Sequence, residues 1–174
     1  LEKIQREIQN HQAGKPAYIQ MKLNSLLDEE FINLLYQASQ AGVKVDLVIR
    51  GICALRAAIP GLSENIQVRS ILGRFLEHSR IFRFANGGDD EYWIGSADLM
   101  HRNLDRRVEA LVRIDQIEDK EILRRSLDLQ FSDTTPCWLM QPDGSWKRKL
   151  NSSDGTPLLD FHAQVINWYK SRES

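Results

Sequence analysis

One histidine in this sequence lies among arginines, in a pattern suited to phosphate chemistry. His78 falls in the stretch GRFLEHSR at residues 73–80, where Glu77 is the nearest acidic residue. Four arginines surround it in the chain: Arg69, Arg74, Arg80 and Arg83. Arginine binds phosphate oxygens through paired N–H groups, and a histidine among arginines can act as a nucleophile, general acid or general base. The cluster indicates a phosphate site, although a solvated strand face with an ordinary histidine explains the same pattern.

Other polar residues come directly after segments that have the composition of strands. Arg50 follows the apolar run at 43–49, and Gly51 beside it would let a ligand or a neighbouring backbone approach closely. Because ligands of α/β sheets bind beyond the carboxyl ends of strands, Arg50 is a candidate phosphate ligand. The alternative for Arg50 is a surface ion pair with a neighbouring acid.

Three second-rank candidates occupy similar positions. Lys22 and Asn24 lie at the end of a β-prone run at 18–23, from which they could point into the same crevice as Arg50. Ser96 follows Gly95 after the run at 91–94, although a Gly-Ser turn closed by Asp98 explains that segment equally well. Arg80 is a further candidate of this rank because it lies two residues after His78.

The elements that must position these residues alternate along the chain. A short amphipathic helix around Ile4 and Ile8 precedes the strand at 18–23. A helix at 31–38 that ends at Gly42 and a strand at 43–49 complete a βαβ unit. Further strands are predicted at 66–72, 80–84, 91–94, 107–114, 137–140 and 146–148, with a hairpin turn at 86–88 and helices at 116–129 and 161–169. The pattern predicts an α/β domain with a mixed central sheet flanked by helices.

Composition limits the classes of protein that fit. With 174 residues, 42% of them hydrophobic, the chain has enough apolar material for one core, and its formal net charge of −1 gives no general attraction to nucleic acid. Cys53 and Cys137 form no C-x-x-C pair, which favours a reducing compartment, and no run approaches the roughly 20 apolar residues of a membrane span. Because the sequence does not begin with Met, we expect a fragment.

Several blocks, in order, resemble polyphosphate kinase. They are MKLNSLLD at 21–28, YQASQAGV at 36–43, VIRGIC at 48–53, PGLSENI at 60–66, GRFLEHSR at 73–80, IGSAD at 94–98 and RNLDRRVE at 102–109. The resemblance covers roughly residues 15–114. It implies a phospholipase D-like fold, which works as two similar halves facing one active site. The chain would be the second half, as a single domain over 1–174 in which residues 131–174 form a hairpin and a closing helix without functional residues.

The resemblance also implies an activity. The family transfers the terminal phosphate of ATP to inorganic polyphosphate, reversibly and with Mg²⁺, through a phosphohistidine in the first half, which no residue here matches. His78 resembles the second half's histidine, taken to contact the nucleotide phosphates and assist proton transfer, and Arg50 resembles a phosphate-contacting arginine. No metal ligand is expected in this chain.

The same resemblance implies binding partners, an oligomeric state and a cellular location. Its partners would be ATP, ADP, polyphosphate and the remaining domains of the enzyme, without nucleic acid. The intact protein would be a cytoplasmic homo-oligomer, with membrane association left open, and the isolated piece would be inactive.

The phospholipase D signature is altered at three positions. Arg80 stands in place of lysine, Ala85 in place of aspartate, and Asp98 in place of the asparagine that follows the Gly-Ser pair. A histidine that depends on a carboxylate would lose its partner without an aspartate at 85, which argues against phosphodiester hydrolysis. The alternatives are a phospholipase D-like phosphodiesterase or nuclease half and a non-catalytic polyanion-binding module.

Overall fold

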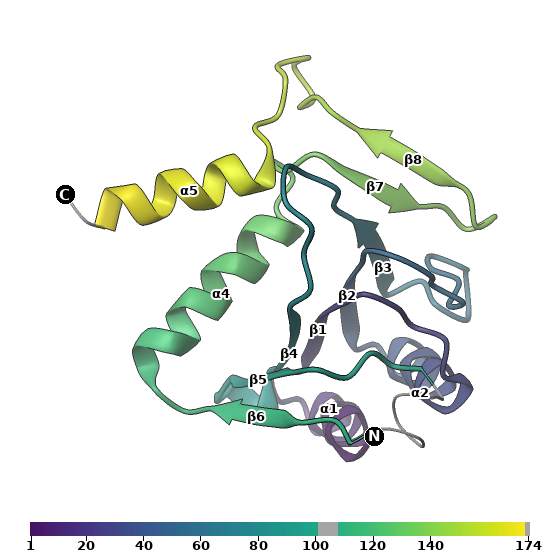
Figure 1. Cartoon of the computed structure of the whole chain (residues 1–174). Helices are drawn as coiled ribbons and strands as arrows, with labels where there is room; N and C mark the ends of the chain where they lie inside the picture. The colour runs from purple at the N-terminus through teal and green to yellow at the C-terminus, as the bar shows by residue number, and fades with distance from the viewer. Residues whose placement is uncertain (101–107, 173–174) are drawn as a thin grey trace.

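A mixed sheet of eight strands organises the part of the chain that the computed structural model describes, residues 1–100 and 108–172. Its strand order is β6-β5-β4-β1-β2-β3-β7-β8 (Figure 1). The strands are β1 (Tyr18–Leu23), β2 (Lys44–Ile49), β3 (Ile66–Ser70), β4 (Arg80–Phe84), β5 (Glu91–Gly95), β6 (Leu111–Ile114), β7 (Cys137–Met140) and β8 (Trp146–Lys149). The mixed α/β architecture expected from the sequence is confirmed.

The centre of the sheet is the predicted βαβ unit. β1, β2 and β3 are parallel, and α2 (Glu29–Gln40) connects the first two. The side chain of Asp28 caps α2 by accepting a hydrogen bond from the backbone N–H of Phe31 at 3.1 Å. The helix stops before Gly42, whose φ of 95° suits glycine. Leu35 and Ala38 of α2 are fully buried in the main hydrophobic core.

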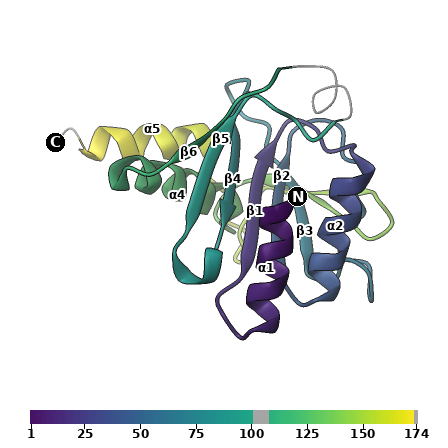
Figure 2. The same cartoon turned by 90° about the horizontal axis from the view of Figure 1, so that it is seen from below.

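Helices cover both faces of the sheet (Figures 1 and 2). α1 (Glu2–Gln12) and α2 pack together on one face, whereas α4 (Ile117–Phe131) and α5 (Phe161–Arg172) lie on the other. Leu127 of α4 is buried in a second, smaller core with Ile81 and Tyr92. Among the described helices, none is long and apolar enough to cross a membrane.

Two predicted strands are shorter than their composition suggested. β3 ends at Ser70 instead of continuing to residue 72, because the chain leaves the sheet there and Leu72 is exposed. β6 begins at Leu111, which pairs with Gly95 at the end of β5, and the preceding Ala110 bonds to Ser96, where β5 has already ended. Residue 107, the first residue of the predicted strand at 107–114, lies outside the described residues.

Strand direction determines which residues can meet. β4 runs antiparallel to β1, and β5 antiparallel to β4. The carboxyl ends of β1, β2, β3 and β5 therefore lie at the same edge of the sheet as the beginning of β4. This edge, called the site edge below, carries Asn24, Arg50, Arg80 and Ser96 directly after or at strand ends.

Candidate functional site

The segment 71–79 joins β3 to β4 across the site edge, and Glu77 connects it to three other elements (Figure 1). The carboxylate of Glu77 accepts from Lys22 Nζ at 2.8 Å and from His162 Nε2 at 2.9 Å. Its backbone carbonyl accepts from Arg50 Nη1 and, with the side-chain amide of Asn24 oriented to satisfy its neighbours, from that amide at 3.2 Å. Glu77 thus gathers Lys22, Asn24 and Arg50 beside His78.

Lys22 is committed to this segment. Its side chain is 4% exposed, and its ammonium group also donates to the carbonyl and the hydroxyl of Ser79, at 3.0 and 2.8 Å. Burial lowers the pKa of Lys22, and the carboxylate of Glu77 opposes that shift. With three oxygen acceptors around its three N–H groups, Lys22 orders the segment and has little capacity left for a ligand.

Arg50 keeps more hydrogen-bond donors available for a ligand than Lys22 does. Of its five N–H groups, only Nη1 donates to another described residue, through the Glu77 carbonyl. Gly51 explains how the chain turns there, since its N–H donates to the carbonyl of Asn24 at 2.8 Å and an added Cβ would lie 2.9 Å from that oxygen. The close approach predicted at Gly51 is therefore made by backbone, and it holds Arg50 against the end of β1.

Arg80 and Asp98, two of the altered signature positions, are partners of each other. Asp98 is 6% exposed and accepts from Arg80 Nη2 at 2.9 Å and Nε at 3.2 Å, and from the backbone N–H groups of Asn24 and Ser25 at 2.7 and 3.2 Å. Burial raises the pKa of Asp98, but these donors outweigh burial and hold the pKa below its usual value. The pair is an ionised link between the β5–β6 segment and the ends of β1 and β4.

His78 projects from this anchored frame. Its carbonyl accepts from Arg80 Nη1 at 2.7 Å, and its neighbours Glu77 and Ser79 are both bonded to Lys22. The residue is exposed, and no hydrogen bond or ion pair joins its ring to any other residue in the described ranges. The backbone of His78 is therefore fixed while its ring stays open to a ligand.

The remaining arginines of the predicted cluster contact other parts of the domain. Arg83 pairs with Asp90 at 2.6 Å, and Arg69, 6% exposed, donates to Gln67 and to the carbonyl of Ser132. The expectation of one cluster of four arginines around His78 was wrong because residues 80 and 83, three apart on a strand, face opposite sides of the sheet. Arg80 remains beside His78, and the exposed Arg74 stacks on Phe75.

Ser96 lies directly after β5 and bonds to the residues that precede β6. Its hydroxyl donates to the carboxylate of Glu109 and accepts from the backbone N–H of Ala110 at 3.2 Å. Among the residues described, neither His78 nor Arg50 bonds to Ser96. The expected closure of a Gly-Ser turn by Asp98 was wrong, because the carboxylate of Asp98 accepts from Arg80 and from the backbone of Asn24 and Ser25.

An aspartate at position 85 would lie too far from His78 to support it, contrary to the expectation from the altered signature. Ala85 comes after β4, so about 17 Å of strand separates it from Arg80 at about 3.3 Å per residue. Ala85 is fully buried, and its backbone N–H donates to the carbonyl of Tyr18 at the beginning of β1. A carboxylate at this position could not touch the ring of His78, so its loss carries no information about support for that histidine.

His162 is the site residue that sequence reasoning missed. It lies in the first turn of α5, in the region to which no function was assigned, and is separated from Glu77 by 85 positions. It is 7% exposed and bonds to the segment 71–79. No spacing or periodicity in the sequence signals this contact.

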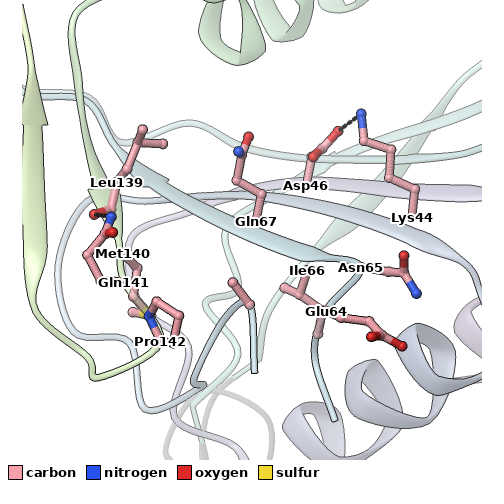
Figure 3. Close-up of a pocket in the computed structure, with 11 residues that line it drawn as sticks. Lys44, Asp46, Glu64, Asn65, Ile66, Gln67, Leu139, Met140, Gln141 and Pro142 are labelled. Carbon is pink, nitrogen blue, oxygen red and sulfur yellow. Dashed lines mark hydrogen bonds and ion pairs between the residues drawn. The ribbon is translucent and has the colours of Figure 1, made fainter. Parts of the chain in front are cut away.

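A cavity of about 590 Å³ lies at the opposite edge of the sheet (Figure 3). The amino ends of β2 and β3 and the end of β7 line it, and the side chains of Lys44 and Asp46 form an ion pair there at 3.2 Å. This cavity is separate from His78 and shares none of the site-edge residues.

The site edge is poorly suited to holding a metal ion by itself. Over the described residues, no group of three or more histidine, cysteine, aspartate or glutamate side chains could hold one. The acids at the edge already accept hydrogen bonds, Glu77 from Lys22 and His162, Asp98 from Arg80, and Glu109 from Ser96. The residues described here therefore do not fit Mg²⁺.

Comparisons with known proteins agree on one family. The model of polyphosphate kinase C-terminal domain 2 matches residues 1–158. Polyphosphate kinase from Streptomyces coelicolor is 54% identical over 170 residues, and that from Pseudomonas aeruginosa is 48% identical over 157. These alignments cover 98% and 90% of this chain, but only 23% of each relative, so the chain spans about a quarter of their length.

Solved structures support the fold. Polyphosphate kinase from Porphyromonas gingivalis superposes with a TM-score of 0.92 at 37% identity, covering 99% of this chain and 26% of that one. NucT from Helicobacter pylori superposes with a TM-score of 0.51 at 11% identity, covering 73% of this chain and 86% of that one, which bears on the fold alone. The phospholipase D-like fold is confirmed. The chain belongs to the polyphosphate kinase family and corresponds to its C-terminal domain 2.

Proposed function

We propose that this domain supplies the phosphate-binding half of a polyphosphate kinase active site, in which the terminal phosphate of ATP is transferred reversibly to inorganic polyphosphate. The observation that carries the proposal is the meeting of Arg50 and His78 at the site edge. Arg50 donates to the carbonyl of Glu77, the residue directly before His78, and the side chains of Arg50 and His78 both keep polar groups open to a ligand. ATP, ADP and polyphosphate are the ligands proposed for these groups.

Each residue has a distinct role in this proposal. Arg50 binds phosphate oxygens through its uncommitted N–H groups, which stabilises negative charge on the transferring phosphoryl group. His78 donates a proton or hydrogen bond to the oxygen that leaves phosphorus, and in the reverse direction accepts the proton back. Positioning and electrostatic stabilisation dominate phosphoryl transfer, which suits a preorganised basic edge.

The nucleophile is proposed to be a histidine outside this chain. That residue would attack the terminal phosphorus of ATP, the bond from phosphorus to the bridging oxygen would break, and ADP would leave. The phosphohistidine would then pass its phosphoryl group to the end of polyphosphate. The isolated domain would be inactive because it lacks that nucleophile. Mg²⁺, if used, would neutralise phosphate charge, with ligands other than the described residues.

The test uses a full-length polyphosphate kinase that carries this sequence as its C-terminal domain. We expect Arg50→Ala and His78→Ala each to lower kcat for ATP-dependent polyphosphate synthesis by about 100-fold or more. Arg113→Ala is the matched control, because Arg113 forms an exposed pair with Asp115 and should leave kcat unchanged. Near-normal turnover in His78→Ala would refute the role of His78.

The same variants distinguish the alternatives. A phosphodiesterase or nuclease half would hydrolyse a generic phosphodiester without ATP. A polyanion-binding module would bind polyphosphate with salt-sensitive affinity, bind no nucleotide and lose no activity in His78→Ala.

A further inference from the structure

His162 holds the segment that carries His78 through several contacts. Its Nδ1 accepts from the backbone N–H of Phe75 at 3.3 Å, and its ring packs edge-on against Phe75 with centroids 5.2 Å apart. Its Nε2 lies 2.9 Å from the carboxylate of Glu77. A Cβ added at Gly73 would lie 2.5 Å from Nδ1, so the backbone approaches the ring closely. These contacts form a clasp between α5 and residues 73–77.

The hydrogen bonds determine which nitrogen carries the proton. Because the N–H of Phe75 can only donate, Nδ1 of His162 must be the unprotonated acceptor. The proton of the neutral ring is then on Nε2, which donates to the carboxylate of Glu77. The two ring nitrogens therefore have separate tasks, one toward the backbone of Phe75 and one toward the side chain of Glu77.

The segment depends on polar contacts because it buries little apolar surface. Leu72, Phe75 and Leu76 are 66%, 52% and 71% exposed. A segment with few buried apolar contacts opens easily unless hydrogen bonds hold it. Glu77 supplies such bonds, since its carboxylate joins His162 to Lys22 and its carbonyl accepts from Arg50.

We propose that His162 is a positioning residue for phosphoryl transfer, which holds Glu77 and thereby fixes His78 and Arg50 relative to each other. This inference rests on the proposed function, and it extends the active site to α5. His162 does not touch the reacting atoms in this proposal. The competing interpretation is that His162 only anchors α5 to the rest of the domain.

Two variants separate the tasks of the ring. His162→Gln places a donor near Nε2 and keeps the bond to Glu77, whereas His162→Asn places an acceptor near Nδ1 and keeps the bond to Phe75. His162→Ala removes both. His11→Ala is the matched control, because His11 is an exposed histidine that also packs against a glycine, Gly42, but on α1.

The first measurement is amide hydrogen exchange at Phe75 in the 174-residue chain, because the N–H of Phe75 donates to Nδ1 of His162. We expect His162→Ala to accelerate exchange at Phe75 by about tenfold or more, and His11→Ala to leave it unchanged. The second is steady-state kinetics in the full-length enzyme. A 1 Å displacement can cost about 100-fold in rate, so we expect kcat to fall about tenfold to 100-fold in His162→Ala, with a smaller change in KM for ATP. His162→Gln should recover most of kcat, and His162→Asn should not.

The outcomes are separable. Unchanged exchange in His162→Ala would overturn the clasp, and faster exchange with unchanged kcat would overturn the positioning role in favour of simple anchoring. If His162→Ala fails to fold, equal kcat in the Gln and Asn variants would overturn the role of the bond to Glu77. Full activity in His78→Ala would instead refute the proposed function, and exchange in the isolated chain would still report on the clasp itself.

Discussion

Replacing Asp98 by asparagine should weaken the domain at the site edge. Asp98 is buried and accepts two bonds from Arg80 and two from the backbone N–H groups of Asn24 and Ser25. Asparagine keeps one oxygen for the two backbone groups, but it removes the negative charge and turns a donor toward Arg80. The variant therefore tests how much the ion pair contributes beyond the backbone contacts.

The expected loss of stability in Asp98→Asn depends on the hydrogen-bond partners that Arg80 keeps. Removing one partner of a buried pair costs about 3–5 kcal/mol when the remaining charge has no other partner. The side chain of Arg80 is 18% exposed and still donates to the carbonyl of His78 at 2.7 Å, so part of its charge stays compensated. We expect Asp98→Asn to lower the free energy of unfolding by about 2–3 kcal/mol at pH 7.

Urea unfolding of the 174-residue chain measures this loss. The matched control is Asp115→Asn, which breaks an exposed ion pair with Arg113 at 2.8 Å and should cost less than about 1 kcal/mol. Because the pKa of Asp98 is lowered on folding, its contribution is present above its ordinary value of 3.8 and is lost as the pH falls further. A loss no greater than that of the control, or one that persists unchanged at pH 2, would refute this reasoning.

Two carboxyl groups around α1 should show opposite pH effects on urea unfolding. Hydrogen bonds from Lys3, Arg6 and Trp93 outweigh burial and lower the pKa of Glu91 from 4.5 to about 2. Glu91→Gln should therefore lower the free energy of unfolding by about 2 kcal/mol at pH 7 after screening, and this loss should fade between pH 4.5 and 2. A loss that stays constant with pH would contradict this. Burial raises the pKa of Glu7, so ionisation of Glu7 should reduce the free energy of unfolding as the pH rises above 4.5. Glu7→Gln should remove that decline. Parallel pH profiles of the free energy of unfolding in the variant and the unchanged chain would contradict this.

The frame of the site could be predicted because it depends on local patterns. The apolar spacing of α2 and the β-prone runs on either side of it predicted a βαβ unit, and parallel strands bring their carboxyl ends to one edge. The approach of Lys22 and Asn24 to Arg50 follows from that geometry alone. The structure adds Glu77 as the residue that joins them.

The other contacts depend on information that a single sequence does not display. Arg69 and Arg83 looked like neighbours of His78 because they are close in the chain, yet side-chain alternation along strands sends them to other partners. His162 reaches Glu77 across 85 positions, through the packing of α5, which no periodicity encodes. Long-range polar contacts of this kind become visible only when the elements are assembled.

The distribution of carboxylates bears on the kind of chemistry that His78 can perform. A histidine that activates a nucleophile usually has a carboxylate on its second nitrogen. The carboxylates at this edge contact other groups: Glu77 contacts Lys22 and His162, Asp98 contacts Arg80 and two backbone groups, and Glu109 contacts the hydroxyl of Ser96. Without such a partner among the described residues, the ring of His78 is suited to binding and protonating phosphate oxygens that arrive from outside. The aspartate missing at position 85 is too distant from His78 to decide between phosphoryl transfer and hydrolysis, so the assays with and without ATP decide between them.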